Sequence, residues 1–173
     1  MINGKKIIVV VCGLSFFLSF CTSEKNENAI TYSCDIDNVI HWSGKEECKK
    51  IKGHTGEYCA FVDSTKEFGF GYKMSLAEIS DKQLKKVRFK AWILSDNPSS
   101  QVSLVLSIEK DGKMYQWKGV KVTDFQVKPN EWFEAIGESE IPNNIPRDAN
   151  VLMYIWSSDK TSALADDFEI SFE

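Results

Sequence analysis

The sequence lacks the short patterns on which most metal, nucleotide and acyl-transfer sites depend. Only two histidines are present, His41 and His54, and no Cys-x-x-Cys pair or His-Glu-x-x-His helix accompanies them, which argues against a zinc site. A nucleophile elbow, a glycine-rich phosphate loop and a dinucleotide fingerprint are also missing. Acidic pairs such as Glu46-Glu47 could in principle serve glycoside hydrolysis, but a solvated surface is the better interpretation. We therefore predict a protein that is not an enzyme.

The chain also lacks internal repeats, low-complexity tracts, proline-rich linkers and long blocks of one charge. Its formal net charge is −4, and it becomes −6 once the two lysines of residues 1–20 are left out. An acidic protein of this kind is a poor partner for nucleic acid. The roughly 140 residues from 30 to 173 are enough for one domain.

One long apolar run stands near the N-terminus. It extends over fourteen residues, from Ile7 to Phe20, and follows Lys5 and Lys6. A membrane-spanning helix needs about 20 residues, so the run is too short to span. The pattern predicts a signal peptide over residues 1–20.

The apolar run stops at Cys21, and a polar tether follows up to residue 29. This arrangement resembles a bacterial lipobox, which implies that Cys21 receives the lipid and becomes the mature N-terminus. A lipid anchor would hold the protein in the bacterial cell envelope, on the outer membrane or cell surface. Phe20 occupies a position where the lipobox has a small residue, which leaves ordinary signal cleavage as an alternative.

Alternation of apolar and polar residues predicts strands over most of the remaining chain. The clearest examples are residues 87–94 and 102–109, and Asp111-Gly112 favours a tight hairpin after the second. Ser75 and Glu78 have the spacing of a capping box, which predicts a turn or two of helix. Further strands are predicted over 31–36, 57–63, 67–74, 114–120, 131–137, 150–157 and 167–172. This pattern predicts an all-β fold, an antiparallel β-sandwich of two sheets.

Three passages together resemble the galactose-binding-like jelly rolls, a fold used by many carbohydrate-binding modules. They are residues 54–62 (HTGEYCAFV), 130–134 (NEWFE) and 165–170 (ADDFEI), and their order also fits that family. The resemblance covers most of residues 30–173. It implies a jelly-roll sandwich. It says little about which ligand the protein binds, because one fold hosts many functions.

The same resemblance implies a structural calcium ion near the last strand. In that family the aspartates that open this strand help to bind calcium, which places the role on Asp166 and Asp167. Asp35 or Asp37 and a carbonyl near Gly56 could complete a set of hard oxygen ligands. The alternative is that these carboxylates only accept hydrogen bonds from loop amides.

Three cysteines of the predicted domain would meet an oxidising compartment after export. A disulfide among Cys34, Cys48 and Cys59 is plausible there, with one thiol left over. Alternation also allows Cys34 and Cys59 to be buried thiols instead.

Aromatic residues are the best candidates for a ligand site, because sugar rings stack on exposed aromatic rings. Trp92 shares the polar face of its strand with Arg88 and Lys90, and Tyr154 shares a face with Trp156. We expect these two faces to line one sheet surface. The alternative is that Trp92 and Trp156 cap the core. The other tryptophans are expected to be structural: Trp42, Trp117 and Trp132.

The first hypothesis is a non-catalytic, lipid-anchored envelope protein that binds carbohydrate, either oligosaccharide or polysaccharide. The second is a structural or adhesive envelope lipoprotein that binds another protein. A third is an accessory domain of an enzyme complex encoded on another chain.

Overall fold

The computed structural model describes residues 29–37, 42, 46 and 48–173. The predicted signal peptide and nearly all of the predicted tether, including Cys21, lie outside the described residues. Within the described ranges, no helix is long and apolar enough to cross a membrane.

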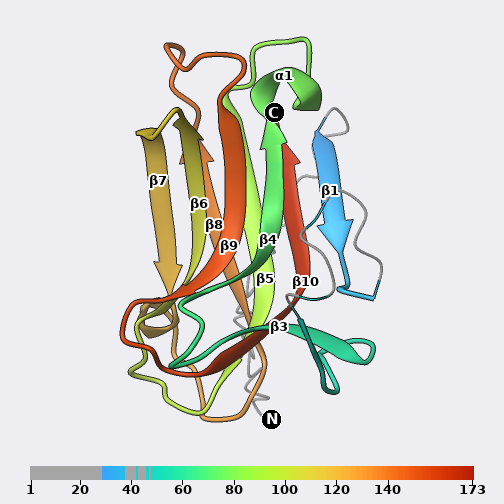
Figure 1. Cartoon of the computed structure of the whole chain (residues 1–173), viewed down its shortest axis with the longest axis vertical. Helices are drawn as coiled ribbons and strands as arrows, with labels where there is room; N and C mark the ends of the chain where they lie inside the picture. The colour runs from blue at the N-terminus through green and yellow to red at the C-terminus, as the bar shows by residue number, and fades with distance from the viewer. Residues whose placement is uncertain (1–28, 38–41, 43–45, 47) are drawn as a thin grey trace, which may run out of the picture.

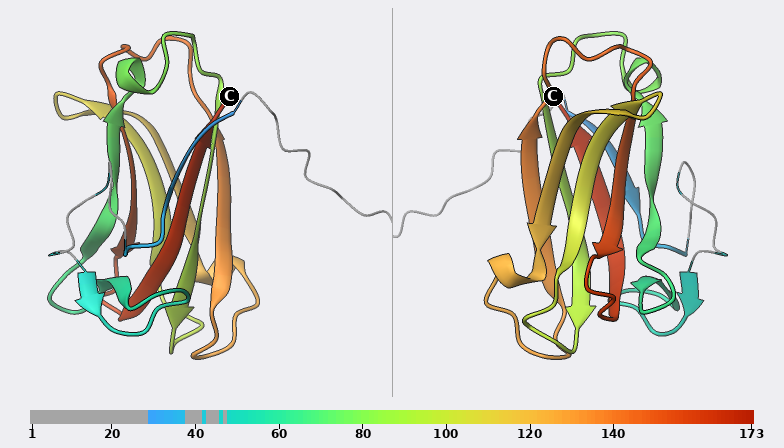
Figure 2. Two further views of the ribbon diagram at one scale, coloured as in Figure 1. Left: turned by 90° about the vertical axis from the view of Figure 1, so that its right-hand side faces the viewer. Right: turned by 60° about the vertical axis from the view of Figure 1, so that its left-hand side comes forward.

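Two antiparallel sheets pack face to face as two layers (Figures 1 and 2). The larger sheet has the order β2, β3, β10, β5, β8, with β1 also paired to β10. Its strands are β1 Ile30–Cys34, β2 Cys48–Lys50, β3 Tyr58–Val62, β5 Lys86–Ser95, β8 Phe133–Glu140 and β10 Ala163–Phe172. The smaller sheet has the order β4, β9, β6, β7, with strands β4 Phe68–Ser75, β6 Val102–Lys110, β7 Lys113–Lys121 and β9 Asn150–Ser157. The prediction of a two-sheet, all-β sandwich is confirmed.

The core lies between the two sheets and follows the predicted alternation. On β5 the inward side chains include Phe89 and Ile93, and on β9 they include Met153 and Ile155; all four are buried. Burying a large apolar side chain stabilises a fold by roughly 1.5–3 kcal/mol. The alternation therefore leaves each sheet with an outer face that is available for other roles.

The two predicted local motifs are both present. Ser75 caps helix α1 (Leu76–Ile79): its backbone N–H donates to Glu78 Oε2 at 3.0 Å, and the Glu78 N–H donates to Ser75 Oγ at 3.3 Å. Asp111 and Gly112 have φ values of 51° and 76° and close the β6–β7 hairpin. Positive φ at both positions matches the twist of a two-residue hairpin turn. A short 3₁₀ helix, Val122–Asp124, follows β7.

Register shifts interrupt three of the strand pairs. They lie between Ile108 and Glu109 in the β6–β7 pair, between Phe68 and Gly71 in β4–β9, and between Asp166 and Glu169 in β10–β5. One extra residue in a strand moves every following side chain to the opposite face. The first two shifts lie in the smaller sheet and decide which aromatic residues reach its outer face.

Candidate functional site

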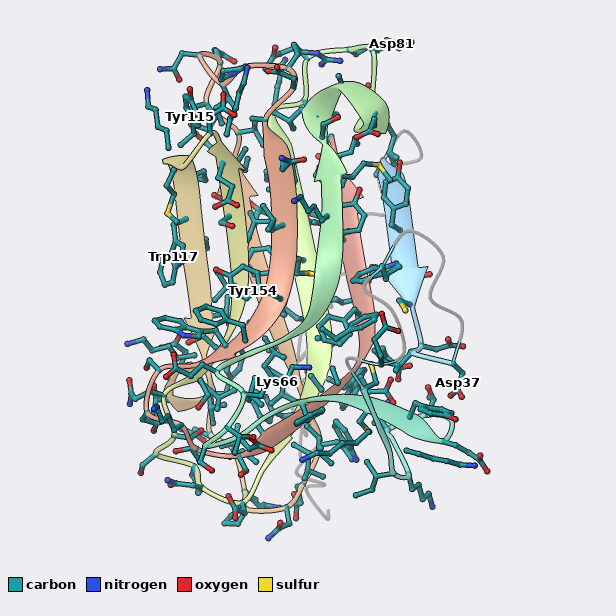
Figure 3. The ribbon with its side chains drawn as sticks, viewed as in Figure 1. Asp37, Lys66, Asp81, Tyr115, Trp117 and Tyr154 are labelled. Atoms are coloured by element: carbon teal, nitrogen blue, oxygen red, sulfur yellow. The ribbon has the colours of Figure 1, made fainter. Side chains whose placement is uncertain are left out.

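The outer face of the smaller sheet carries a cluster of four aromatic side chains. Tyr154 and Trp156 point outward from β9, because the alternate residues of that strand fill the core. Trp117, on β7, lies opposite Ser107 of β6. Phe68, at the start of β4, lies opposite Trp156 of β9. Figure 3 shows the side chains of Trp117 and Tyr154 beside their strands. We refer to Phe68, Trp117, Tyr154 and Trp156 as the aromatic face.

The rings of the aromatic face contact one another across three strands. Phe68 is nearly parallel to Trp156, with centroids 6.2 Å apart and planes at 11°, and its centroid is 5.9 Å from that of Tyr154. Trp117 meets Trp156 edge to face at 6.3 Å and 87°. Phe68 is 57% exposed and Trp117 is 43% exposed. Large apolar side chains this open to solvent, gathered on one sheet, mark a binding surface.

A groove of about 340 Å³ runs beside Phe68 and Tyr154. Its lining includes the polar side chains of Lys73, Ser107 and Glu109, from strands β4 and β6. Aromatic faces with a few polar groups at their edge are the usual composition of a small-molecule site. The groove can therefore offer both ring stacking and hydrogen bonds to a ligand.

Tyr154 is held in place by its neighbours. Burial raises the pKa of its hydroxyl, and the donor groups of the neighbouring Ser107 and Trp117 side chains act in the opposite direction, since they favour the phenolate oxygen. Beneath the rings, Val105 faces outward on β6 and is nevertheless fully buried. The aromatic side chains thus cover the centre of the sheet and form the floor of the site.

The prediction that Trp92 shares this surface with Tyr154 and Trp156 is wrong. Trp92 lies on β5 in the larger sheet, whereas Tyr154 and Trp156 lie on β9 in the smaller one. Both strands direct these side chains away from the core, so the two groups lie on opposite sides of the sandwich. Alternation fixes the face of a strand but not the sheet to which the strand belongs.

Trp92 instead packs against the loop that leads into β3. Its ring stacks on His54 at 3.9 Å with planes at 10°, and Trp132 meets His54 edge to face at 5.7 Å. One face of the Trp92 ring is therefore covered by protein. This packing matches the structural role that sequence analysis assigned to Trp132.

Arg88 and Lys90 take part in ion pairs across the outer face of the larger sheet. Arg88 Nε lies 2.7 Å from Glu138, and this hydrogen bond raises the pKa of the guanidinium. Lys90 pairs with Glu134 at 3.1 Å and Glu169 at 3.8 Å. Partial burial alone would lower the pKa of Lys90, but the two glutamates outweigh it and raise the pKa. Neither cation lies at the edge of the aromatic face, which corrects the prediction.

The carboxylates proposed for calcium gather around residues 53–57, but as acceptors from the loop itself. Asp166 accepts from the Thr55 and Asp167 amides at 3.0 and 2.8 Å, and burial raises its pKa to about 6. Asp167 accepts from the Thr55 hydroxyl at 2.6 Å and contacts His54 Nδ1 at 2.6 Å. This is the alternative that sequence analysis left open.

The other proposed ligands do not complete a metal site. Asp37 accepts from the Glu57 amide at 3.1 Å, beside Gly56, whose φ is +59°. Asp35 lines a hollow of about 370 Å³ that Asp167, Lys90 and Trp92 also line. In the part of the chain that the structure describes, no group of three or more His, Cys, Asp or Glu side chains is arranged to hold a metal ion. Calcium binding by these carboxylates together with a backbone carbonyl therefore stays a prediction.

No disulfide joins Cys34, Cys48 and Cys59 within the described ranges. Cys48 lies opposite Ala60, and Cys59 lies opposite Lys49, so the two thiols point to different faces of the β2–β3 pair. Cys34 and Cys59 are buried. Burial and the charge of Asp166 raise the pKa of Cys59 to about 12, which leaves it unreactive.

Sequence reasoning missed two residues of the aromatic face. Trp117 was expected to be structural. An uninterrupted hairpin closed by Asp111-Gly112 would indeed place it opposite Leu106 in the core. The register shift after Ile108 moves Trp117 opposite Ser107 instead. Phe68 was not singled out, and the shift before Gly71 turns it outward. The only signal in the sequence is Gly69 and Gly71, because glycine in a strand often marks a bulge.

Solved structures with a similar backbone include several carbohydrate-binding modules. A xylan-binding domain of carbohydrate-binding module family 22 aligns with a TM-score of 0.53 and 14% identity, covering 84% of this chain and 95% of that one. The second family 22 module of Paenibacillus barcinonensis Xyn10C, also xylan-binding, has a TM-score of 0.51 and 15% identity over 82% and 99%. The fold is that of these carbohydrate-binding modules.

The C-terminal family 22 module of Clostridium thermocellum Xyn10B also matches, with a TM-score of 0.51 and 13% identity over 81% of this chain and 91% of that one. No family model and no curated protein sequence matches the chain. At these identities the comparisons establish the fold. The predicted resemblance to jelly rolls of carbohydrate-binding modules is confirmed at that level.

Proposed function

We propose that this chain is a non-catalytic envelope lipoprotein that binds oligo- or polysaccharide on the outer face of its smaller sheet. The observation that carries the proposal is the aromatic face, in which Phe68 and Trp117 are 57% and 43% exposed, beside a groove whose lining includes Lys73, Ser107 and Glu109. Sugar rings present an apolar face for stacking and hydroxyls for hydrogen bonds, and this surface offers a partner for each.

The spread of the rings favours a chain of sugars over a single sugar. Ring contacts of this kind contribute on the order of 1 kcal/mol each, and association must first overcome lost translational freedom. A monosaccharide reaches one ring, whereas an oligosaccharide reaches several across β7, β9 and β4. The protein is therefore expected to bind hexasaccharides much more tightly than the corresponding monosaccharides.

Envelope anchoring through Cys21 completes the proposal. Its support is the apolar run after two lysines, which ends at a cysteine and a polar tether. A lipidated N-terminus would present the sandwich at a membrane surface, where it could capture polymer for other proteins. No catalytic group is assigned to the chain.

A glycan array followed by titration calorimetry tests the binding proposal. The first ligands are xylan-derived oligosaccharides, because the structural neighbours are xylan-binding, with cello- and manno-oligosaccharides beside them. Saturable binding that is weakened by Trp156→Ala supports the proposal. No saturable response to any glycan would contradict it and favour the alternative, a structural or adhesive protein whose aromatic face binds another protein.

A further inference from the structure

Gly119 lies on β7, an edge strand of the smaller sheet, two residues after Trp117 on the same outer face. It is opposite Val105 on β6, which in turn lies opposite Tyr154 on β9. Glycine in the interior of a strand weakens the strand, so it needs a reason. Backbone conformation does not supply one, since the described glycines with positive φ are Gly56 and Gly112.

The reason is the position of the Trp117 ring. A Cβ atom on Gly119 would lie 2.5 Å from Cη2 of Trp117 and 3.2 Å from the two neighbouring ring carbons. Real Cβ atoms essentially never approach other atoms to 2.5 Å. The ring therefore leans along the strand into the space that the absent side chain leaves.

This position lets Trp117 make its ring contact within the aromatic face. Its ring meets Trp156 edge to face, with centroids 6.3 Å apart and planes at 87°. A ring pushed away from Gly119 would lose the geometry of this contact while staying on the surface.

We propose that Gly119 is a positioning residue, which holds Trp117 in the orientation that the ligand-binding surface requires. The inference rests on the proposed function for its consequence in binding, but the ring position itself is independent of any ligand. Gly119→Ala should displace the ring at little cost in stability, because the clash is with the far end of an exposed side chain. Glycine to alanine in a strand with ordinary φ also reduces the entropy of the unfolded chain.

The ligand-free test observes the indole N–H signals of the full chain by ¹H–¹⁵N correlation NMR. The signal of Trp117 is assigned from Trp117→Phe, and Trp156→Leu gives its position without the edge-to-face ring contact. Gly119→Ala should move the Trp117 signal toward its position in Trp156→Leu, while Lys118→Ala, on the same strand, should leave it unchanged. A Trp117 signal that stays at the parent position in Gly119→Ala would overturn the inference.

The binding test is a double-mutant cycle with xylohexaose and cellohexaose, using whichever the parent protein binds more tightly. Trp117→Ala and Gly119→Ala should each weaken binding about fivefold, as expected for one lost ring contact. The double variant should bind no more weakly than Trp117→Ala alone, because both changes remove the same interaction. Additive losses, or unchanged binding by Gly119→Ala, contradict the inference. Unchanged binding by Trp117→Ala contradicts the proposed function instead.

Discussion

Two tryptophans on opposite sides of the sandwich should respond to alanine substitution in opposite ways. Trp92 stacks on His54 at 3.9 Å and helps to hold residues 53–57 against the larger sheet. Trp117 is 43% exposed and lies on an edge strand of the smaller sheet. The first should therefore matter for stability and the second for ligand binding.

The magnitudes follow from burial. Removing a fully buried tryptophan typically costs about 3–5 kcal/mol. Trp92 is half-buried. We therefore expect Trp92→Ala to lower the free energy of unfolding by about 2 kcal/mol. For a domain of this size that corresponds to a fall in Tm of roughly 4–8 °C. Trp117→Ala should change the free energy of unfolding by less than about 1 kcal/mol and weaken oligosaccharide binding about fivefold.

Thermal unfolding by circular dichroism and titration calorimetry on each variant check both halves of this prediction. Trp92→Ala should melt earlier and bind the oligosaccharide as the parent does. Loss of binding by Trp92→Ala at an unchanged Tm would place the site on the larger sheet and refute the reasoning. A large fall in Tm for Trp117→Ala would show that its ring belongs to the core.

Three further predictions concern Asp166, calcium and Cys21. Burial raises the pKa of Asp166 to about 6, above its value in an unfolded chain, so the stability that its protonated carboxyl contributes is present below about pH 4 and is lost as the pH rises through about 6. Between pH 4 and 6 the free energy of unfolding of the parent should fall by roughly 2 kcal/mol more than that of Asp166→Asn in denaturant titrations. If calcium binds at Asp166 and Asp167, millimolar calcium should raise the Tm above its value in chelator. Equal Tm values in calcium and chelator, with no metal found by elemental analysis, would contradict calcium binding and leave the loop amides as the partners of these carboxylates. Cys21→Ser should move the protein from membranes to the soluble fraction, and a variant that still incorporates radioactive palmitate would exclude lipidation at Cys21.

Alternation was a reliable guide wherever a strand keeps its register. It predicted the inward residues of β5, β6 and β9, and it placed Tyr154 and Trp156 together on one face of β9. The hairpin at Asp111-Gly112 and the capping box at Ser75 were equally predictable. Each depends on the conformational preference of a few neighbouring residues.

The composition of the aromatic face depends on features that alternation does not contain. Phe68 has the same parity as Phe70 and Tyr72, which are both buried, yet a register shift turns Phe68 outward. The extra residue in β7 does the same for Trp117. The prediction that Trp92 points away from the core was correct, but the prediction that it shares a surface with Tyr154 was wrong. The sheet to which β5 belongs is set by its long-range pairing with β10, which alternation within β5 does not reveal.

The location of the ligand site is tested most directly by an NMR titration of the parent protein with xylohexaose, or with the best glycan from the array. The chain has five tryptophans and therefore five indole N–H signals. Our account predicts that the signals of Trp117 and Trp156 shift in a saturable way, while those of Trp92 and Trp132 stay in place. Shifts confined to Trp92 and Trp132, or no shift at saturating ligand, would contradict a carbohydrate site on the smaller sheet.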